Sequence, residues 1–247
     1  MSPVIVITLG TGDAFGSGGR AHSGILIQAS GRRLLIDPGP CILPQLQKAG
    51  ISAGNIDSVL ITHLHGDHIA GLPFLLLDCE FSSKRKRPLL VTGPRGSAKR
   101  LQALVNSCYP ELSPKKRSFA LTYQQVAANN EFMLAGTRVT AFSMNHNQSG
   151  ICLGYRLQAG KKVVSVTGDT GWCDSIVTLA DGADLLLIEC TNYSTETAGH
   201  LSYRDIAHHR HELRSRRIVL THVGEELLRN SGRVRLPIAR DGGRIIV

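Results

Sequence analysis

The sequence lacks the segments that would place the protein in a membrane or outside the cell. Its longest apolar runs fall short of the roughly 18 residues that a membrane-spanning helix needs. The chain begins Met1-Ser2-Pro3 and continues into a β-like run, without the basic start and cleavage site of a signal peptide. Its six cysteines form no CxxC pair. These absences predict a cytoplasmic protein with reduced cysteines and no membrane contact.

Internal repeats, low-complexity tracts and linkers are absent too, which excludes solenoid, fibrous and disordered classes. With 42% hydrophobic and 19% charged residues, the 247-residue chain can bury a large core, and we expect residues 1–247 to form a single domain. Alternation of short apolar runs with helical segments predicts a layered α/β fold. The expected strands are residues 4–9, 24–29, 33–37, 57–62, 88–92, 138–142, 151–157, 162–167, 184–189 and 217–221. The expected helices are residues 42–49, 68–79, 96–107, 173–180 and 202–214.

The positive charge is concentrated in one segment. Lys84 to Arg117 contains ten basic residues and one acidic residue, Glu111, so this stretch carries the whole net charge of +9. Such a local field attracts a polyanion or a phosphorylated substrate. Contact with nucleic acid through this basic segment is one interpretation, and a solvated surface that keeps the protein in solution is the other.

The strongest chemical signal follows the expected strand at 57–62. Three imidazoles and one carboxylate lie within six positions of one another in the run Thr62-His63-Leu64-His65-Gly66-Asp67-His68. Such groups suit zinc, manganese or iron, and strand-like alternation directs the first two histidines to the same side. Gly66 allows a tight turn that brings Asp67 and His68 to a second position. This spacing predicts a metal site.

One loop cannot complete two coordination spheres, so further ligands must come from elsewhere in the chain. Three residues have the same context, a polar side chain just beyond an expected strand: His146, Asp169 and His222. Each alone is a weak signal, because a histidine at a strand end is often structural. Together they supply the number and the type of ligand that the loop lacks.

These motifs resemble the metallo-β-lactamase superfamily, in which HxHxDH is followed by a distal His, Asp and His. The resemblance covers nearly the whole chain and implies a four-layer αββα sandwich with two divalent metal ions, zinc being expected and manganese or iron being alternatives. A hydroxide shared by the metals would be the nucleophile, and Asp67 would orient it or accept its proton. The implied ligands are His63, His65 and His146 for one metal, Asp67, His68 and His222 for the other, and Asp169 as the bridge.

Within the superfamily the chain looks like the ribonuclease Z-type phosphodiesterases. By that resemblance, Glu189 and His200 assist catalysis, with His200 protonating the leaving oxygen. The implied substrate is a phosphodiester in RNA, a nucleotide or a small molecule, and the family's homodimer is a compatible assembly. The similarity rests on Leu9-Gly10-Thr11-Gly12, Gly168-Asp169-Thr170, Ile188-Glu189-Cys190-Thr191, Gly199-His200-Leu201-Ser202 and Leu220-Thr221-His222.

The chain also departs from the ribonuclease Z pattern. The arm that holds tRNA in that family falls between the counterparts of His146 and Asp169, and here residues 147–168 are largely used by two expected strands. The loop at residues 16–23 and the stretch after His222 differ from the family's as well. These departures weaken an inference to tRNA processing and leave the metal chemistry unchanged.

Three other functions compete with a phosphodiesterase. A carbonyl-ester hydrolase, acting on a lactone, thioester or β-lactam, would use the same metals. Glu189, His200 and the basic segment favour phosphodiesters, whereas the missing arm keeps the ester hydrolase open. A redox di-iron site resembles this loop but has a carboxylate where His65 stands. A non-catalytic binding module would be expected to lack some of the metal ligands, and every expected ligand is present.

Overall fold

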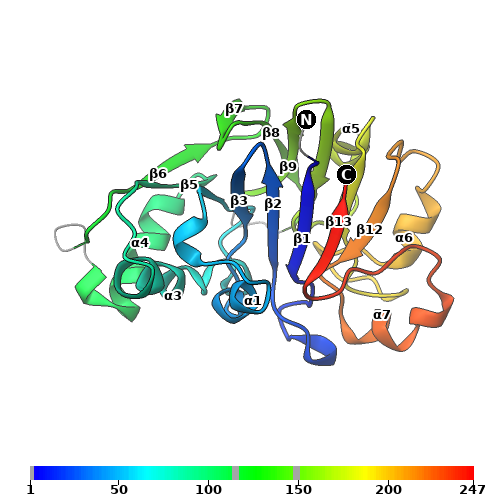
Figure 1. Ribbon diagram of the computed structural model, residues 1–247. Coiled ribbons are helices and arrows are strands. Elements are labelled where there is room, and N and C mark those ends of the chain that lie inside the picture. The colour runs from blue at the N-terminus through cyan, green and yellow to red at the C-terminus, as the bar shows by residue number, and fades with distance from the viewer. Residues whose placement is uncertain (1–2, 113–116, 147–150) are drawn as a thin grey trace.

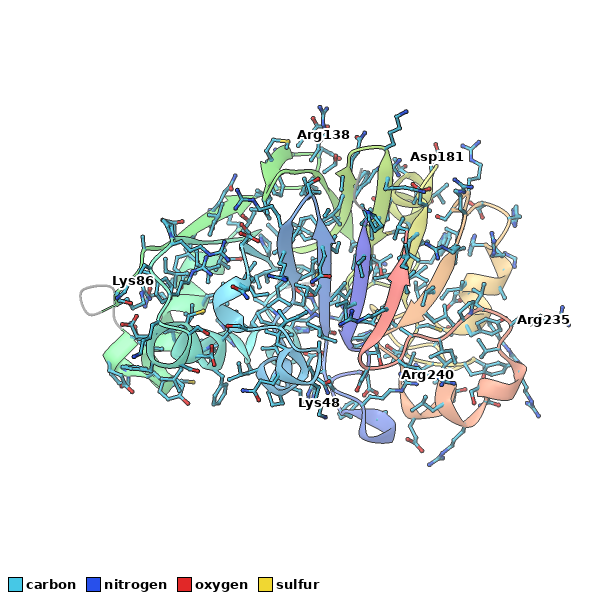
Figure 2. The ribbon with its side chains drawn as sticks, viewed as in Figure 1. Lys48, Lys86, Arg138, Asp181, Arg235 and Arg240 are labelled. Carbon is cyan, nitrogen blue, oxygen red and sulfur yellow. The ribbon has the colours of Figure 1, made fainter. Side chains whose placement is uncertain are left out.

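The computed structural model describes residues 3–112, 117–146 and 151–247. Two β-sheets lie face to face, and helices cover the outer face of each, which gives four layers in the order α, β, β, α (Figure 1). Side chains fill the space between these layers (Figure 2). The αββα arrangement predicted from the sequence is thus confirmed. Among the described residues, no helix has the length and apolar character needed to cross a lipid bilayer.

Each sheet joins a parallel to an antiparallel part. In the first sheet, β3 to β6 are parallel and β13, β1, β2 and β3 are antiparallel; in the second, β12 to β10 are parallel and β10 to β7 are antiparallel. Within the described ranges, the spatial order of the first sheet is β13 (Gly243–Ile246), β1 (Ile5–Gly10), β2 (Gly24–Ala29), β3 (Arg32–Ile36), β4 (Ser58–Leu60), β5 (Leu89–Pro94) and β6 (Leu121–Val126). That of the second is β12 (Ile218–Thr221), β11 (Leu185–Glu189), β10 (Lys162–Val166), β9 (Cys152–Ala159), β8 (Thr137–Met144) and β7 (Glu131–Leu134).

Helices connect the strands on the outer faces. The α-helices are α1 (Ile42–Lys48), α2 (Gly66–Ile69), α3 (Leu72–Leu77), α4 (Ser97–Cys108), α5 (Asp174–Ala180), α6 (Tyr203–His208) and α7 (Glu225–Arg229). Shorter helical turns are η1 (Ser17–Gly19), η2 (Ala53–Asn55), the π-helical turn η3 (Asp78–Ser82), η4 (Pro110–Leu112) and η5 (Ser231–Arg233).

Three apolar cores hold the four layers together. One lies between the first sheet and α1, α3 and α4, a second between the two sheets, and a third between the second sheet and α5, α6 and α7. Successive side chains of a strand point to opposite faces, so a strand covered on both sides contributes to two cores. In β11, Leu185 and Leu187 face the first sheet, whereas Leu186 and Ile188 face the helices.

The sequence-based expectations failed at the sheet edges and at two helices. The helix expected over residues 68–79 is divided into α2, α3 and the π-helical turn η3, because Pro73, which has no backbone N–H, begins a new helix in the first turn of α3. Every expected strand is present, but β6, β7 and β13 were not predicted, and each lies at an edge of its sheet. Edge strands such as β6 are only partly buried, so their sequences lack the continuous apolar run that marks a central strand. The helix expected over residues 202–214 ends at His208, because His209 stacks on Trp172 and bonds to Glu212 in a turn.

Tyr155 ties the two sheets together beside the histidine-rich loop. Its hydroxyl, on β9 of the second sheet, donates to the carbonyl oxygen of Ile61 at the end of β4 in the first sheet, at 2.7 Å. The ring is fully buried, and burial raises the pKa of Tyr155 well above its usual value, so the hydroxyl stays a donor. This bond holds the start of the loop that carries His63 against the second sheet.

We predict that Tyr155→Phe lowers the free energy of unfolding by about 1–2 kcal/mol, because the buried Ile61 carbonyl loses its donor. Urea denaturation of the metal-free protein measures the change. Tyr123→Phe is the matched control, since the buried Tyr123 hydroxyl has no hydrogen-bond partner among the described residues. Equal destabilisation by both substitutions would contradict a role for the bond to Ile61.

Candidate metal centre and active site

The histidine-rich loop leaves β4 at the edge where several strands of both sheets end. His63 and His68 are buried, Asp67 is half-buried and His65 is exposed. The distal residues predicted from the sequence reach the same place: His146 follows β8, Asp169 follows β10 and His222 follows β12. Because all these strands end at the same edge, side chains far apart in the sequence converge there.

The possible ligand atoms of the described residues form four overlapping groups; two include His200, and the other two consist of predicted ligands alone. His63, His65 and His146 make one group, and Asp67, His68, Asp169 and His222 make the other; within each group the atoms lie within 4.8 Å of one another. The structure therefore brings together all seven residues that were predicted as ligands from the sequence.

Asp169 lies between the two groups. Its Oδ2 atom is 3.3 Å from His68 Nε2 and 3.2 Å from His222 Nε2 in one group. It is also 3.8 Å from His63 Nε2 and 4.0 Å from His146 Nε2 in the other. A carboxylate in this position is suited to bridge two cations.

Buried polar atoms without partners mark where cations fit. His63 Nε2, His68 Nε2 and Asp169 Oδ1 are buried and have no hydrogen-bond partner among the described residues. Buried polar atoms are nearly always paired, so unpaired ones need an explanation such as a bound ion. Imidazole nitrogens and carboxylate oxygens are the donors that zinc and similar divalent ions take. The residues present thus fit divalent metal ions.

The electrostatics of the second group favour ionised carboxylates. Burial opposes charge on Asp169, but the neighbouring rings of His222 and His68 hold the pKa of Asp169 well below its usual value. Burial also opposes charge on His222, yet Asp169 and Asp67 raise the pKa of His222 to about 9. At neutral pH these carboxylates are balanced by protons on the imidazoles, and a cation that binds between them displaces protons.

Glu189 and His200 form a hydrogen-bonded pair next to both groups. Glu189 is the last residue of β11, and its Oε1 atom lies 2.9 Å from His200 Nδ1. The His200 ring is 4.8 Å from that of His146 and 5.7 Å from that of His222. Burial disfavours a charged His200, but the bond to Glu189 outweighs it and raises the pKa of His200. The ring is therefore suited to hold a proton for transfer.

Comparison with known proteins agrees with this geometry. A family model described as "Anti-Pycsar protein Apyc1" matches residues 4–236. The chain belongs to this family. Among curated relatives, ribonuclease Z of Methanothermobacter thermautotrophicus is 26% identical, with 88% of this chain and 86% of that protein covered.

Solved structures place this Apyc1-family chain in a wider group. The metallo-β-lactamase fold protein YhfI of Bacillus subtilis is similar over 100% of both chains, with a TM-score of 0.82 and 23% identity. The short form of human tRNase Z is similar over 98% of both chains, with a TM-score of 0.79 and 27% identity. The chain is a ribonuclease Z-like member of the metallo-β-lactamase superfamily, which confirms the resemblance seen in the sequence.

Asp37 is a site residue that the sequence analysis missed. It follows β3 and accepts hydrogen bonds from the Thr62 amide at 2.8 Å, the Thr62 hydroxyl at 2.6 Å and His68 Nδ1 at 2.9 Å. These bonds fix the first residue of the loop and leave His68 Nε2 to face the cation position. The signal was present, because Asp37 is a polar residue directly after a buried strand, the context that identified Asp169.

Two further contacts orient histidines of these groups through their Nδ1 atoms. His146 Nδ1 donates to the carbonyl oxygen of Gly199 at 2.8 Å, and His222 Nδ1 lies 3.3 Å from the Thr191 hydroxyl. Gly199 has φ of 77°, and a Cβ atom there would lie 1.9 Å from the carbonyl oxygen of His146. Only glycine permits this close approach. Such outer contacts fix the tautomer and the orientation of ligand rings.

We predict that Asp37→Ala weakens divalent metal binding about 10–100-fold, because His68 and Thr62 lose the acceptor that orients them. Competition with a chromogenic chelator measures the affinity. The matched control is Asp57→Ala: Asp57 precedes β4 at its other end, and its carboxylate accepts from the Arg33 amide, away from the ligands. Equal loss of affinity in both variants would indicate a general loss of stability instead.

Proposed function

We propose that this protein is a two-metal phosphodiesterase or nuclease that hydrolyses a phosphodiester in RNA, a nucleotide or a small molecule. The observation that carries the proposal is the Glu189–His200 pair beside the two ligand groups. A leaving alkoxide needs a proton, and a histidine with a raised pKa can supply it. Similarity to ribonuclease Z supports the same reading.

In this proposal the seven converging residues hold two divalent ions, with zinc as the expected metal and manganese or iron as alternatives. When bound, such ions lower the pKa of a water molecule and neutralise charge that develops on phosphate oxygens. The proposed ligands are His63, His65 and His146 for one ion, Asp67, His68 and His222 for the other, and Asp169 for both.

The proposed catalytic groups have separate tasks. His200 Nδ1 is engaged by Glu189, which leaves Nε2 as the atom that donates a proton to the leaving oxygen. Glu189 is itself fixed, since its carboxylate accepts from the amides of Thr170 and Thr191 at 2.9 and 3.2 Å. Asp67 Oδ2 contacts His222 and His68 at 3.3 and 3.1 Å, from where it can orient the attacking water as well as ligate.

Part of the basic segment supports contact with nucleic acid. Arg85 is buried and its guanidinium donates to four backbone carbonyls, so it serves the fold. Lys115 and Lys116 lie outside the described residues. Lys86 projects from the outer edge of the molecule (Figure 2). We propose that phosphates contact the exposed cations of the segment, which are Lys84, Lys86, Arg87, Arg95, Lys99 and Arg100.

We predict that the zinc- or manganese-loaded protein hydrolyses bis(p-nitrophenyl) phosphate and that His65→Ala reduces the turnover to background, because a ligand of the first group is lost. Release of p-nitrophenol measures the rate, and p-nitrophenyl acetate and a lactone panel are assayed in parallel. Cleavage of an ester or a lactone by metal-loaded protein that is inert towards the phosphodiester would replace the proposal with a carbonyl-ester hydrolase.

We predict that His200→Ala lowers turnover about 10²–10⁴-fold and leaves the metal content unchanged, because the ring supplies a proton and no metal bond in this mechanism. Steady-state kinetics and elemental analysis of the same preparation measure the two quantities. Loss of metal in parallel with activity would make His200 a structural residue.

The pH profile gives an independent check on His200. An acid must be protonated to act, so turnover is retained below the raised pKa of His200 and falls as the pH rises through it. Glu189→Gln removes the charge that raises this pKa, so the alkaline limb of the profile should move to lower pH. An unmoved limb would assign it to another group.

A further inference from the structure

A cavity of about 700 Å³ opens beside the proposed acid, within the range of cavities that hold small ligands. His200 and His222 form part of its wall. Hydrolysis adds the oxygen of water to phosphorus and a proton to the leaving oxygen, and His200 is the proposed donor of that proton. The group that departs from phosphorus therefore occupies this cavity. The lining residues come from the loop after β1, the segment after β11 and the start of α7.

Phe15 stands at this cavity with its ring almost wholly in solvent. The residue is one of those that line the cavity, and it is 91% exposed, more than any other large hydrophobic residue described. A single exposed apolar residue is ordinary on a protein surface, so its exposure alone carries no meaning. The informative observation is that this exposed aromatic residue lines the same cavity as His200.

The loop that presents Phe15 is held in place by a buried carboxylate. Asp13 is 4% exposed and accepts hydrogen bonds from the Phe15 amide at 3.1 Å, the Ser17 amide at 3.0 Å and the Ser17 hydroxyl at 2.8 Å. Gly16 has φ of 64°, which permits the turn directly after the ring. A ring held by a fixed backbone is a preorganised platform for stacking.

The cavity is also lined by a polar segment that hydrogen bonds hold in place. Glu226 accepts from the Ser194 amide and hydroxyl at 3.2 and 2.9 Å and from the Thr195 amide at 3.2 Å, which ties the segment before His200 to α7. In that segment Asn192 donates to Thr197 at 2.8 Å, and both residues line the cavity. The cavity that Phe15 lines therefore also offers side-chain amide and hydroxyl groups that suit the edge of a planar, hydrogen-bonding ring.

The charges of the cavity limit what can enter it. Asp13, Glu225 and Glu226 line it together with His200 and His222 at its inner end beside the metal centre, and no lysine or arginine does among the described residues. A second phosphate on the leaving group would meet these carboxylates and be repelled. The exposed cations of α4 lie at the other end of the molecule from α7 in Figure 1. The anionic part of a substrate is thus favoured on the α4 side and a neutral part beside Phe15.

We propose that Phe15 is a specificity-determining residue that stacks on an aromatic base of the leaving group. The favoured substrate is then a phosphodiester whose leaving side is a nucleoside without a second phosphate. This inference rests on the proposed phosphodiesterase activity. Stacking of a base on an aromatic side chain contributes about 1–2 orders of magnitude to binding, and it tolerates different bases because each has an aromatic face.

The test uses metal-loaded protein and three substrates: a dinucleoside monophosphate and two counterparts, each with one base replaced by an abasic sugar. Analysis of the products shows which oxygen leaves. We expect loss of the base on the leaving side to reduce kcat/KM about tenfold in the wild-type protein and loss of the other base to have a smaller effect. Phe15→Ala should abolish this discrimination, and Phe15→Trp should keep it.

Phe81→Ala is the matched control, because Phe81 is 58% exposed and does not line the cavity; it should discriminate as the wild type does. Binding of adenosine to the metal-free protein, followed by saturation-transfer NMR, gives a second readout that Phe15→Ala should weaken and Phe81→Ala should not. A Phe15→Ala protein that discriminates like the wild type overturns the proposal. So does a Phe15→Ala protein that dissociates from dimer to monomer in sedimentation velocity, since Phe15 would then be a subunit contact.

The proposed phosphodiesterase activity and the proposed role of Phe15 would be refuted by different results. Wild-type protein that cleaves neither the dinucleoside nor bis(p-nitrophenyl) phosphate refutes the phosphodiesterase and, with it, the role of Phe15. Wild-type protein that cleaves phosphodiesters without preferring a base on the leaving side refutes the role of Phe15 alone.

Discussion

The carboxylate of Asp169 is 3% exposed, and one of its oxygens faces imidazole nitrogens of His63, His68, His146 and His222 at 3.2–4.0 Å. A buried carboxylate is costly unless positive charge lies beside it. These rings come from three loops, which follow β4, β8 and β12. The site therefore exists only while both sheets keep their strand ends at a common edge, and the apolar core between the sheets is what holds them there.

One residue, Thr191, contacts both the proposed acid and a proposed metal ligand. The Thr191 hydroxyl donates to Glu189 at 3.0 Å and lies 3.3 Å from the Nδ1 atoms of both His200 and His222. The orientation of the proposed acid and that of a proposed ligand are thus set by the same short segment after β11. A change in the orientation of one of these histidines would alter the orientation of the other, because the Thr191 hydroxyl contacts Glu189, His200 and His222.

The sequence predicted the central strands and the polar residues that converge at their ends for a common reason. Central strands are covered on both faces and read as continuous apolar runs, and a polar residue directly after such a run, such as His146 or Asp169, stands out. Edge strands such as β6 lack that run, and Asp37 was overlooked, although it too follows a buried strand, because its hydrogen bonds to Thr62 and His68 are formed only in the folded chain. The role proposed for Phe15 could not be predicted from the sequence, because it depends on a cavity that forms only in the folded chain.

The pairing of β1 with β13 joins the two ends of the described chain. Ile5 lies opposite Ile246, with the whole remaining fold between them in sequence (Figure 1). Bringing together two segments so far apart in the sequence lowers the entropy of the chain before any stabilising contact forms between them. Contacts of this kind slow folding. On the ribosome, one edge of β1 stays open until residues 243–246 have been synthesised. The first sheet is therefore completed only after residues 243–246 have been made, and until then the nascent chain presents unpaired backbone N–H and C=O groups along that edge of β1.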